Sequence, residues 1–136
     1  MNTVDDVNER HGIGASDACI ALSSLSFDLS VYDIFGLLSC GGRVVLPPAE
    51  CTSPPSPSAW LSVLEEERVS VWNSVPAFVE LLVGYAEHSG VSLSESLRVV
   101  LMSGDWIPLG LPPRVLGLSR ASEMRVVSMG LSLIHI

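Results

Sequence analysis

Five short apolar runs alternate with helix-like segments along the chain, and this alternation restricts the possible fold more than any other feature. The apolar runs lie at 18–23, 43–46, 69–73, 98–102 and 124–128. Helical spacing of apolar residues, or helix start and stop signals, mark 2–11, 30–39, 58–68, 76–88 and 111–120. Strands that are each followed by a helix need crossover connections. The sequence therefore predicts an α/β fold, part of a doubly wound, mostly parallel sheet with helices on both faces.

The composition excludes several classes of function. The formal net charge of −8 argues against a nucleic-acid partner, because few cations are available to neutralise phosphates. All seven basic residues are arginine, so no mechanism can use a lysine of this chain. No apolar run approaches the length of a membrane span, and the polar start at 1–10 does not resemble a signal peptide.

The three cysteines predict the compartment. Cys19, Cys40 and Cys51 are an odd number and form no Cys-x-x-Cys pair. This pattern favours reduced thiols over disulfides or metal ligands, and we expect a cytoplasmic protein.

Polar residues and glycines follow four of the five predicted strands. Asp28 follows the first strand, Asn73 ends the third, Ser103 and Gly104 follow the fourth, and Met129 and Gly130 follow the fifth. In parallel sheets, ligands bind at the carboxyl ends of the strands. Asp28 stands between an apolar strand and an apolar helix, where a carboxylate is costly unless a cation pairs with it. The α-ammonium group of an amino acid would be such a cation.

Four segments carry a family resemblance: FDLSVYDIFG with the following GGRVVLP, then VWNSVPAFVELLV, then LRVVLMSGDWIPLGLP. Together, and in this order, they resemble the adenylation domain of nonribosomal peptide synthetases, within the adenylate-forming superfamily. The resemblance implies that residues 1–130 are a partial AMP-binding domain, the half that contains the substrate pocket.

The resemblance also implies a role for each pocket residue. Asp28 would pair with the substrate ammonium, and the pocket would be lined by Leu29, Tyr32, Asn73, Leu101, Ser103 and Met129. This set resembles that of cysteine-activating members, where leucine is usual at the position of Met129. A small pocket with an amide and a hydroxyl suits a thiol side chain, but it does not separate cysteine from serine.

The implied cofactors are ATP and magnesium. In the family, an amino acid carboxylate attacks the α-phosphate of ATP, and the acyl group then passes to the phosphopantetheine thiol of a carrier domain. Gly104 and Gly130 match the positions where the backbone approaches the adenine. Condensation or heterocyclisation domains of the same synthetase are the further partners that the resemblance implies.

The chain departs from the family pattern after Gly130. Relatives continue with Gly-Ala-Thr-Glu, and that glutamate helps to hold magnesium, whereas this chain reads LSLIHI at 131–136. These residues match a translation of CTG TCT CTT ATA CAC ATC, the transposon end used in sequencing libraries. We therefore expect 131–136 to be adaptor read-through, with a genuine C-terminal strand as the alternative. The family's triphosphate loop and catalytic lysine are also missing, so we expect the isolated chain to be inactive.

Two other functions remain open from the sequence. The chain could belong to an aryl- or fatty-acid-activating member of the superfamily, but Asp28 would then have no ammonium to pair with. It could also be a non-catalytic, doubly wound binding module in which Asp28, Asn73 and Ser103 serve as caps and turn residues.

Overall fold

The computed structural model describes residues 8–10, 12–20, 36–45, 56–102, 107–121 and 124–128. In these residues the strands are β1 (Ala18–Ile20), β2 (Arg43–Val45), β3 (Val71–Ser74), β4 (Val99–Met102) and β5 (Arg125–Ser128). The helices are α3 (Leu37–Ser39), α4 (Pro57–Glu66), α5 (Pro76–Ser89) and α6 (Leu111–Leu118). Residues 8–10 are helical as well.

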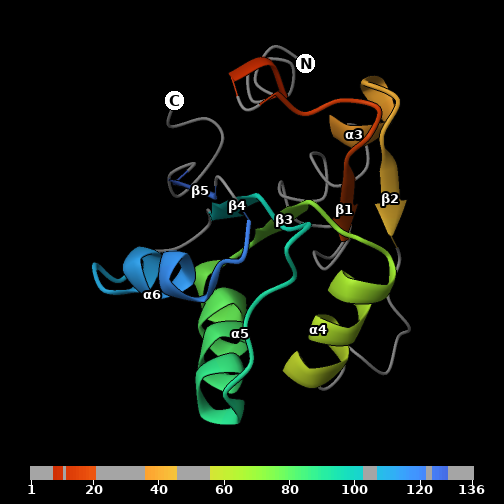
Figure 1. Ribbon diagram of the computed structural model, residues 1–136. Coiled ribbons are helices and arrows are strands. Elements are labelled where there is room, and N and C mark those ends of the chain that lie inside the picture. The colour runs from red at the N-terminus through yellow and green to blue at the C-terminus, as the bar shows by residue number, and fades with distance from the viewer. Residues whose placement is uncertain are drawn as a thin grey trace.

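All five strands form one parallel sheet in the order β2-β1-β3-β4-β5 (Figure 1). The chain passes from β1 to β2 at one edge and then returns to β3 on the other side of β1. This reversal between β1 and β3 is the topological switch point of a doubly wound sheet. The predicted fold class is confirmed.

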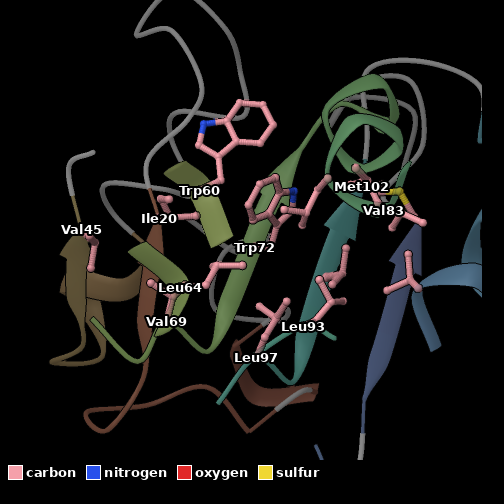
Figure 2. Packing of buried hydrophobic residues seen from close by; sticks show 14 of the residues in the cluster. Ile20, Val45, Trp60, Leu64, Val69, Trp72, Val83, Leu93, Leu97 and Met102 are labelled. Atoms are coloured by element: carbon pink, nitrogen blue, oxygen red, sulfur yellow. The ribbon is translucent and has the colours of Figure 1, made fainter. Parts of the chain in front are cut away.

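One face of the sheet packs against three helices, α4, α5 and α6, which lie together on one side of it in Figure 1. The strand residues of this apolar cluster include Ile20, Trp72 and Met102. Figure 2 shows Ile20 and Trp72 near Trp60 and Leu64 of α4, and Met102 beside Val83 of α5. The Trp60 and Trp72 rings meet edge to face with centroids 5.6 Å apart. Such aromatic pairs contribute beyond the area that they bury.

The opposite face carries the alternate strand residues, because successive side chains in a strand point to opposite sides. Cys19, Val71, Val99 and Leu101 form a second apolar cluster there with Ile13, and Cys40, directly after α3, packs against it. Every residue of β3 and β4 is consequently buried. This burial on both faces explains why β4 is a continuous apolar run, whereas β3 ends in two buried polar residues, Asn73 and Ser74.

Helix ends follow the local sequence signals. Prolines 57 and 76 occupy the first position of α4 and α5, where a missing N–H costs nothing. Gly90 ends α5 in the left-handed conformation with φ of 69°. Such a residue lets the backbone N–H bond back to the last turn, here to the carbonyls of Ala86 and Glu87.

Three predicted boundaries are wrong by two residues. The helix expected to run to Arg68 ends at Glu66, and Arg68 has φ of 49°. The third strand begins at Val71 instead of Val69, and the Val69 backbone N–H bonds the Leu64 carbonyl of α4 at 3.1 Å. The helix expected to run to Arg120 ends at Leu118. Arg120 instead donates from Nε to the Leu93 carbonyl at 2.8 Å.

Candidate functional site

Asn73 lies near the carboxyl end of β3, beside the switch point between β1 and β3. The residue before it, Trp72, is in register with Ile20, the last residue of β1. The Asn73 side chain is fully buried. A buried amide at this end of a doubly wound sheet lies where ligands of such sheets bind.

Leu101 is the direct register partner of Asn73 on β4. Partners in a parallel pair project to the same face, so both side chains lie on the face opposite α4, α5 and α6. Val127 of β5 is in turn the register partner of Leu101 and packs against the same cluster. The structure thus brings together two of the residues that the sequence assigned to one pocket, although they are far apart in the chain.

The other predicted site residues lie outside the described part of the chain. These are the pocket residues Asp28, Leu29, Tyr32, Ser103 and Met129, and the two nucleotide-binding glycines Gly104 and Gly130. Residues 131–136 also lie outside it. The roles assigned to them stay predictions.

A buried ionic network lies at the opposite, amino-terminal edge of the sheet. Arg98 Nη2 donates to Asp17 Oδ2 at 2.7 Å, and Arg98 Nε donates to Asp17 Oδ1 at 3.2 Å. Ser70 Oγ donates to Asp17 Oδ1 at 2.7 Å, and the Gly14 backbone N–H donates to Oδ2 at 2.9 Å. The Asp17 side chain is only 5% exposed, so these four hydrogen bonds replace the water that hydrates an exposed carboxylate.

The pKa of the Asp17 carboxyl reflects both its burial and these hydrogen bonds. Burial by itself raises the pKa of the Asp17 carboxyl, but hydrogen bonds from Arg98, Ser70 and Gly14, with the charge of Arg98, outweigh burial and hold the pKa below its ordinary value of 3.8. The network was not predicted from the sequence. In the structure Asp17, Ser70 and Arg98 each come directly before a strand, whereas the sequence predicted that Ser70 and Arg98 lie inside strands.

A groove of about 690 Å³ opens elsewhere, on the helix layer between α4 and α5. It is lined by Leu61 and Tyr85 together with serines and the Glu65–Arg120 ion pair. Neither Asn73 nor Leu101, the two predicted site residues within the described ranges, lines it. We assign the candidate site to the carboxyl ends of the strands, because residues with a predicted chemical role meet there.

No group of three or more His, Cys, Asp and Glu side chains in the described part of the chain could hold a metal ion. Within the same ranges, no helix has the length and apolar content needed to cross a membrane.

Comparison with known proteins decides the family. The family model described as "AMP-binding enzyme" matches residues 1–129. The chain belongs to the AMP-binding enzyme family. The predicted resemblance to nonribosomal peptide synthetase adenylation domains is also confirmed, by relatives of that class.

Two curated relatives of this AMP-binding chain are large proteins. The Anguibactin system regulator of Vibrio anguillarum is 47% identical over 114 residues, which cover 84% of this chain and 11% of that protein. Pyochelin synthetase PchF of Pseudomonas aeruginosa is 46% identical over 114 residues, which cover 83% of this chain and 6% of that protein. The chain therefore matches only a small part of the length of each relative.

A solved structure of the same family is equally similar. The nonribosomal peptide synthetase FmoA3 in its AMPPNP-bound form superposes with a TM-score of 0.86 and is 46% identical, covering 95% of this chain and 14% of FmoA3. FmoA3 has also been solved with α-methyl-L-serine-AMP bound, and that form superposes with a TM-score of 0.85. The AMP-binding fold seen here is thus the fold of a synthetase that binds nucleotide.

Proposed function

We propose that this chain is the amino-acid-selecting part of a nonribosomal peptide synthetase adenylation domain, and that the domain activates L-cysteine. The observation that carries the proposal is the pairing of Asn73 and Leu101, buried side by side near the switch point. Both residues occupy positions that the family resemblance assigns to the side-chain pocket. The 46% identity to FmoA3, solved with an aminoacyl-type adenylate, supports the same reaction class.

The proposed reaction has two balanced steps. An amino acid carboxylate oxygen attacks the α-phosphorus of ATP, and pyrophosphate leaves with the bonding electrons. The sulfur of a carrier-domain phosphopantetheine thiol then attacks the acyl carbon and gives up its proton to solvent, and AMP leaves with the electrons of the acyl carbon–oxygen bond. In this scheme Asp28 pairs with the ammonium group, and Asn73, Leu101 and Ser103 shape the space around the side chain. ATP and magnesium supply the activated phosphate and its charge neutralisation.

Gly104 and Gly130 would approach the adenine, but they lie outside the described ranges. The chain has no lysine, so the lysine chemistry of the family would come from other parts of the synthetase. We propose that the carrier, condensation and heterocyclisation domains are likewise other parts of the synthetase. We also propose a cytoplasmic setting, in which the cysteine thiols remain reduced.

Serine is the second candidate substrate. FmoA3 was solved with α-methyl-L-serine-AMP, and it is as similar to this chain as the curated relatives are. Serine and cysteine differ by one atom, and a small pocket discriminates such pairs weakly. Residues 29, 32, 103 and 129, which would decide between them, lie outside the described ranges.

The test is substrate-dependent ATP–pyrophosphate exchange by a complete adenylation domain that contains this sequence. We expect exchange with cysteine, less with serine, and none with aryl or fatty acids, which lack the ammonium that Asp28 would bind. Asp28→Ala should abolish exchange while the domain stays folded by circular dichroism. Equal exchange by Asp28→Ala and the parent domain would refute the proposal, and loss of folding alone would favour the non-catalytic binding module.

The 136-residue chain by itself provides a second test. We expect it to show no pyrophosphate exchange with any amino acid. Cysteine-dependent pyrophosphate exchange by the isolated chain would contradict the proposal that other parts of the synthetase are needed for adenylation.

A further inference from the structure

Asp17, Ser70 and Arg98 occupy matching places in the sheet. Asp17 directly precedes β1, Ser70 directly precedes β3, and Arg98 directly precedes β4. Extending the register of the β3–β4 pair back by one residue places Ser70 opposite Arg98. The three central strands, β1, β3 and β4, are therefore each preceded by one residue of a single polar cluster. We call the cluster of Asp17, Ser70 and Arg98 the entry clamp.

The Asp17 carboxylate joins the other two residues of the entry clamp. Its Oδ1 accepts from Ser70 Oγ at 2.7 Å and from Arg98 Nε at 3.2 Å. Ser70 Oγ also accepts from the Ala18 backbone N–H at 3.0 Å. The backbone repeats the connection, because Arg98 N–H donates to the Ser70 carbonyl at 2.9 Å. Asp17 Oδ1 thus bonds the residues that precede β3 and β4, and this shared acceptor aligns the starts of the two strands.

A shift of β4 relative to β3 would break these contacts together. Moving Arg98 by one residue displaces it about 3.3 Å along the sheet, which exceeds the tolerance of its two hydrogen bonds to Asp17. A one-residue shift also turns each side chain to the other face of the sheet. Both strands have only four residues, so few ladder hydrogen bonds are available to resist such a shift.

The candidate pocket depends on the same register. Asn73 is three residues after Ser70, and Leu101 is three residues after Arg98, so their pairing follows directly from the pairing in the entry clamp. The distance along the strands is about 10 Å. Without the correct register, Met102 or Val100 would stand opposite Asn73, and both belong to the helix-covered face.

We propose that Asp17 is a positioning residue for the amino-acid pocket: through Ser70 and Arg98 it fixes the register that places Asn73 beside Leu101. The proposal rests on the proposed function for its link to substrate selection, and on the contacts of the entry clamp for the register itself. Asp17 touches no substrate in this scheme. Its effect is on selectivity, because contacts that distinguish two short side chains require Asn73 and Leu101 to be held in one position.

The experiment compares variants of the complete adenylation domain that contains this chain. Asp17→Asn keeps the shape of the side chain and removes its charge. Glu87→Gln is the matched control, because Glu87 is an exposed residue of α5 that pairs with Arg114 of α6 at 2.5 Å. Should Asp17→Asn fail to fold, Arg98→Lys is the milder variant, since it keeps the charge and loses the two-pronged geometry.

Two readouts are measured for each variant. The first is kcat/KM for cysteine and for serine, which gives the selectivity ratio. The second is amide hydrogen exchange of residues 71–74 and 99–102 under native conditions. We expect Asp17→Asn to raise KM for cysteine on the order of tenfold and to lower the selectivity ratio, with faster exchange in both strands. Glu87→Gln should change neither.

Each outcome decides the matter. Lower thermal stability with an unchanged selectivity ratio would overturn the proposal, because Asp17 would then be only a structural residue. If the parent domain activates no amino acid, the proposed function has failed, and amide hydrogen exchange alone tests the entry clamp. In that case, an unchanged rate of amide hydrogen exchange at 99–102 in Asp17→Asn would overturn the role of the clamp, and a faster rate would support it.

Discussion

Asn73 of β3 and Leu101 of β4 stand directly opposite each other on the face of the sheet that α4, α5 and α6 do not cover. Asn73 is fully buried, and so is Leu101. A polar amide therefore lies beside an apolar side chain near the carboxyl end of the two central strands. This relationship is what makes a selective pocket for a short side chain plausible at that end of the sheet.

The first prediction uses the two faces of β3. In a complete adenylation domain, Asn73→Ala should lower kcat/KM for the activated amino acid roughly 10–100-fold, because a polar group of the pocket is removed. The measurement is the initial rate of pyrophosphate exchange as a function of amino acid concentration.

Ser74→Ala is the matched control for that variant. Ser74 is the next residue and is equally buried, but it bonds Trp72 on the helix-covered side, at 2.7 Å from Trp72 Nε1. Its removal should cost about 1–2 kcal/mol of stability and leave the kinetics unchanged. Equal kinetic losses in both variants would contradict the assignment of the pocket to one face.

The second prediction concerns pH. The folded-state pKa of Asp17 lies below its ordinary value of 3.8, so folding favours the ionised carboxylate. The stabilisation is fully present above the unfolded pKa and is lost as the pH falls through the lowered folded pKa. Asp17→Asn should therefore cost about 1.5–3 kcal/mol at neutral pH, the range for hydrogen bonds to a charged group.

Urea unfolding of this chain and of Asp17→Asn, from about pH 7 down to about pH 2, measures the difference in free energy. The difference should be constant at neutral pH and should shrink below about pH 4. A difference that does not change with pH would show that the charge of Asp17 is not what stabilises the fold.

The third prediction separates two buried tryptophans. Trp60 and Trp72 are both fully buried and contact each other edge to face. Trp72 Nε1 donates to Ser74 Oγ, whereas Trp60 Nε1 is buried with no acceptor among the described residues. Replacement by phenylalanine removes a satisfied donor in one case and an unsatisfied donor in the other.

Trp72→Phe should therefore destabilise the chain by about 1 kcal/mol more than Trp60→Phe does. Urea unfolding followed by far-ultraviolet circular dichroism gives both values. A larger loss for Trp60→Phe would mean that ring packing, including the contact of Trp60 with Phe78, outweighs hydrogen bonding here.

The fourth prediction uses two glycines of the α5 region. Gly84 lies inside α5, and a Cβ there meets nothing within 4 Å, so Gly84→Ala should stabilise the chain by about 0.5–1 kcal/mol. Gly90 also has open space around it but has φ of 69°. Gly90→Ala should destabilise by about 1 kcal/mol, because alanine is strained in the left-handed region.

The same substitution should thus shift the thermal midpoint in opposite directions at two positions six residues apart. Differential scanning calorimetry of the two variants checks the signs. Destabilisation by both would indicate that α5 is held mainly by its packing against α4 and α6 and gains nothing from backbone propensity.

The sequence by itself determined the kind of elements and their order. Apolar runs separated by helical segments gave the parallel sheet, since β-branched and apolar residues suit strands buried on both faces. Pro76 and Gly90 marked the ends of α5, because their effect on the backbone is local. The family resemblance placed Asn73 and Leu101 in one pocket, and their pairing in the structure agrees with that placement, although their roles and those of Asp28 and the other pocket residues stay predictions.

Only the tertiary structure decided the rest. The partnership of Asp17 with Arg98 spans 81 positions of the chain, and no local pattern in the sequence announces it. The Val69 N–H bonds the Leu64 carbonyl of α4, and the Arg120 guanidinium bonds the Leu93 carbonyl; neither contact is visible in the sequence pattern. Element type follows from short-range sterics and periodicity, whereas the contact of Asp17 with Arg98 depends on the strand order, which brings residues distant in sequence to one edge of the sheet.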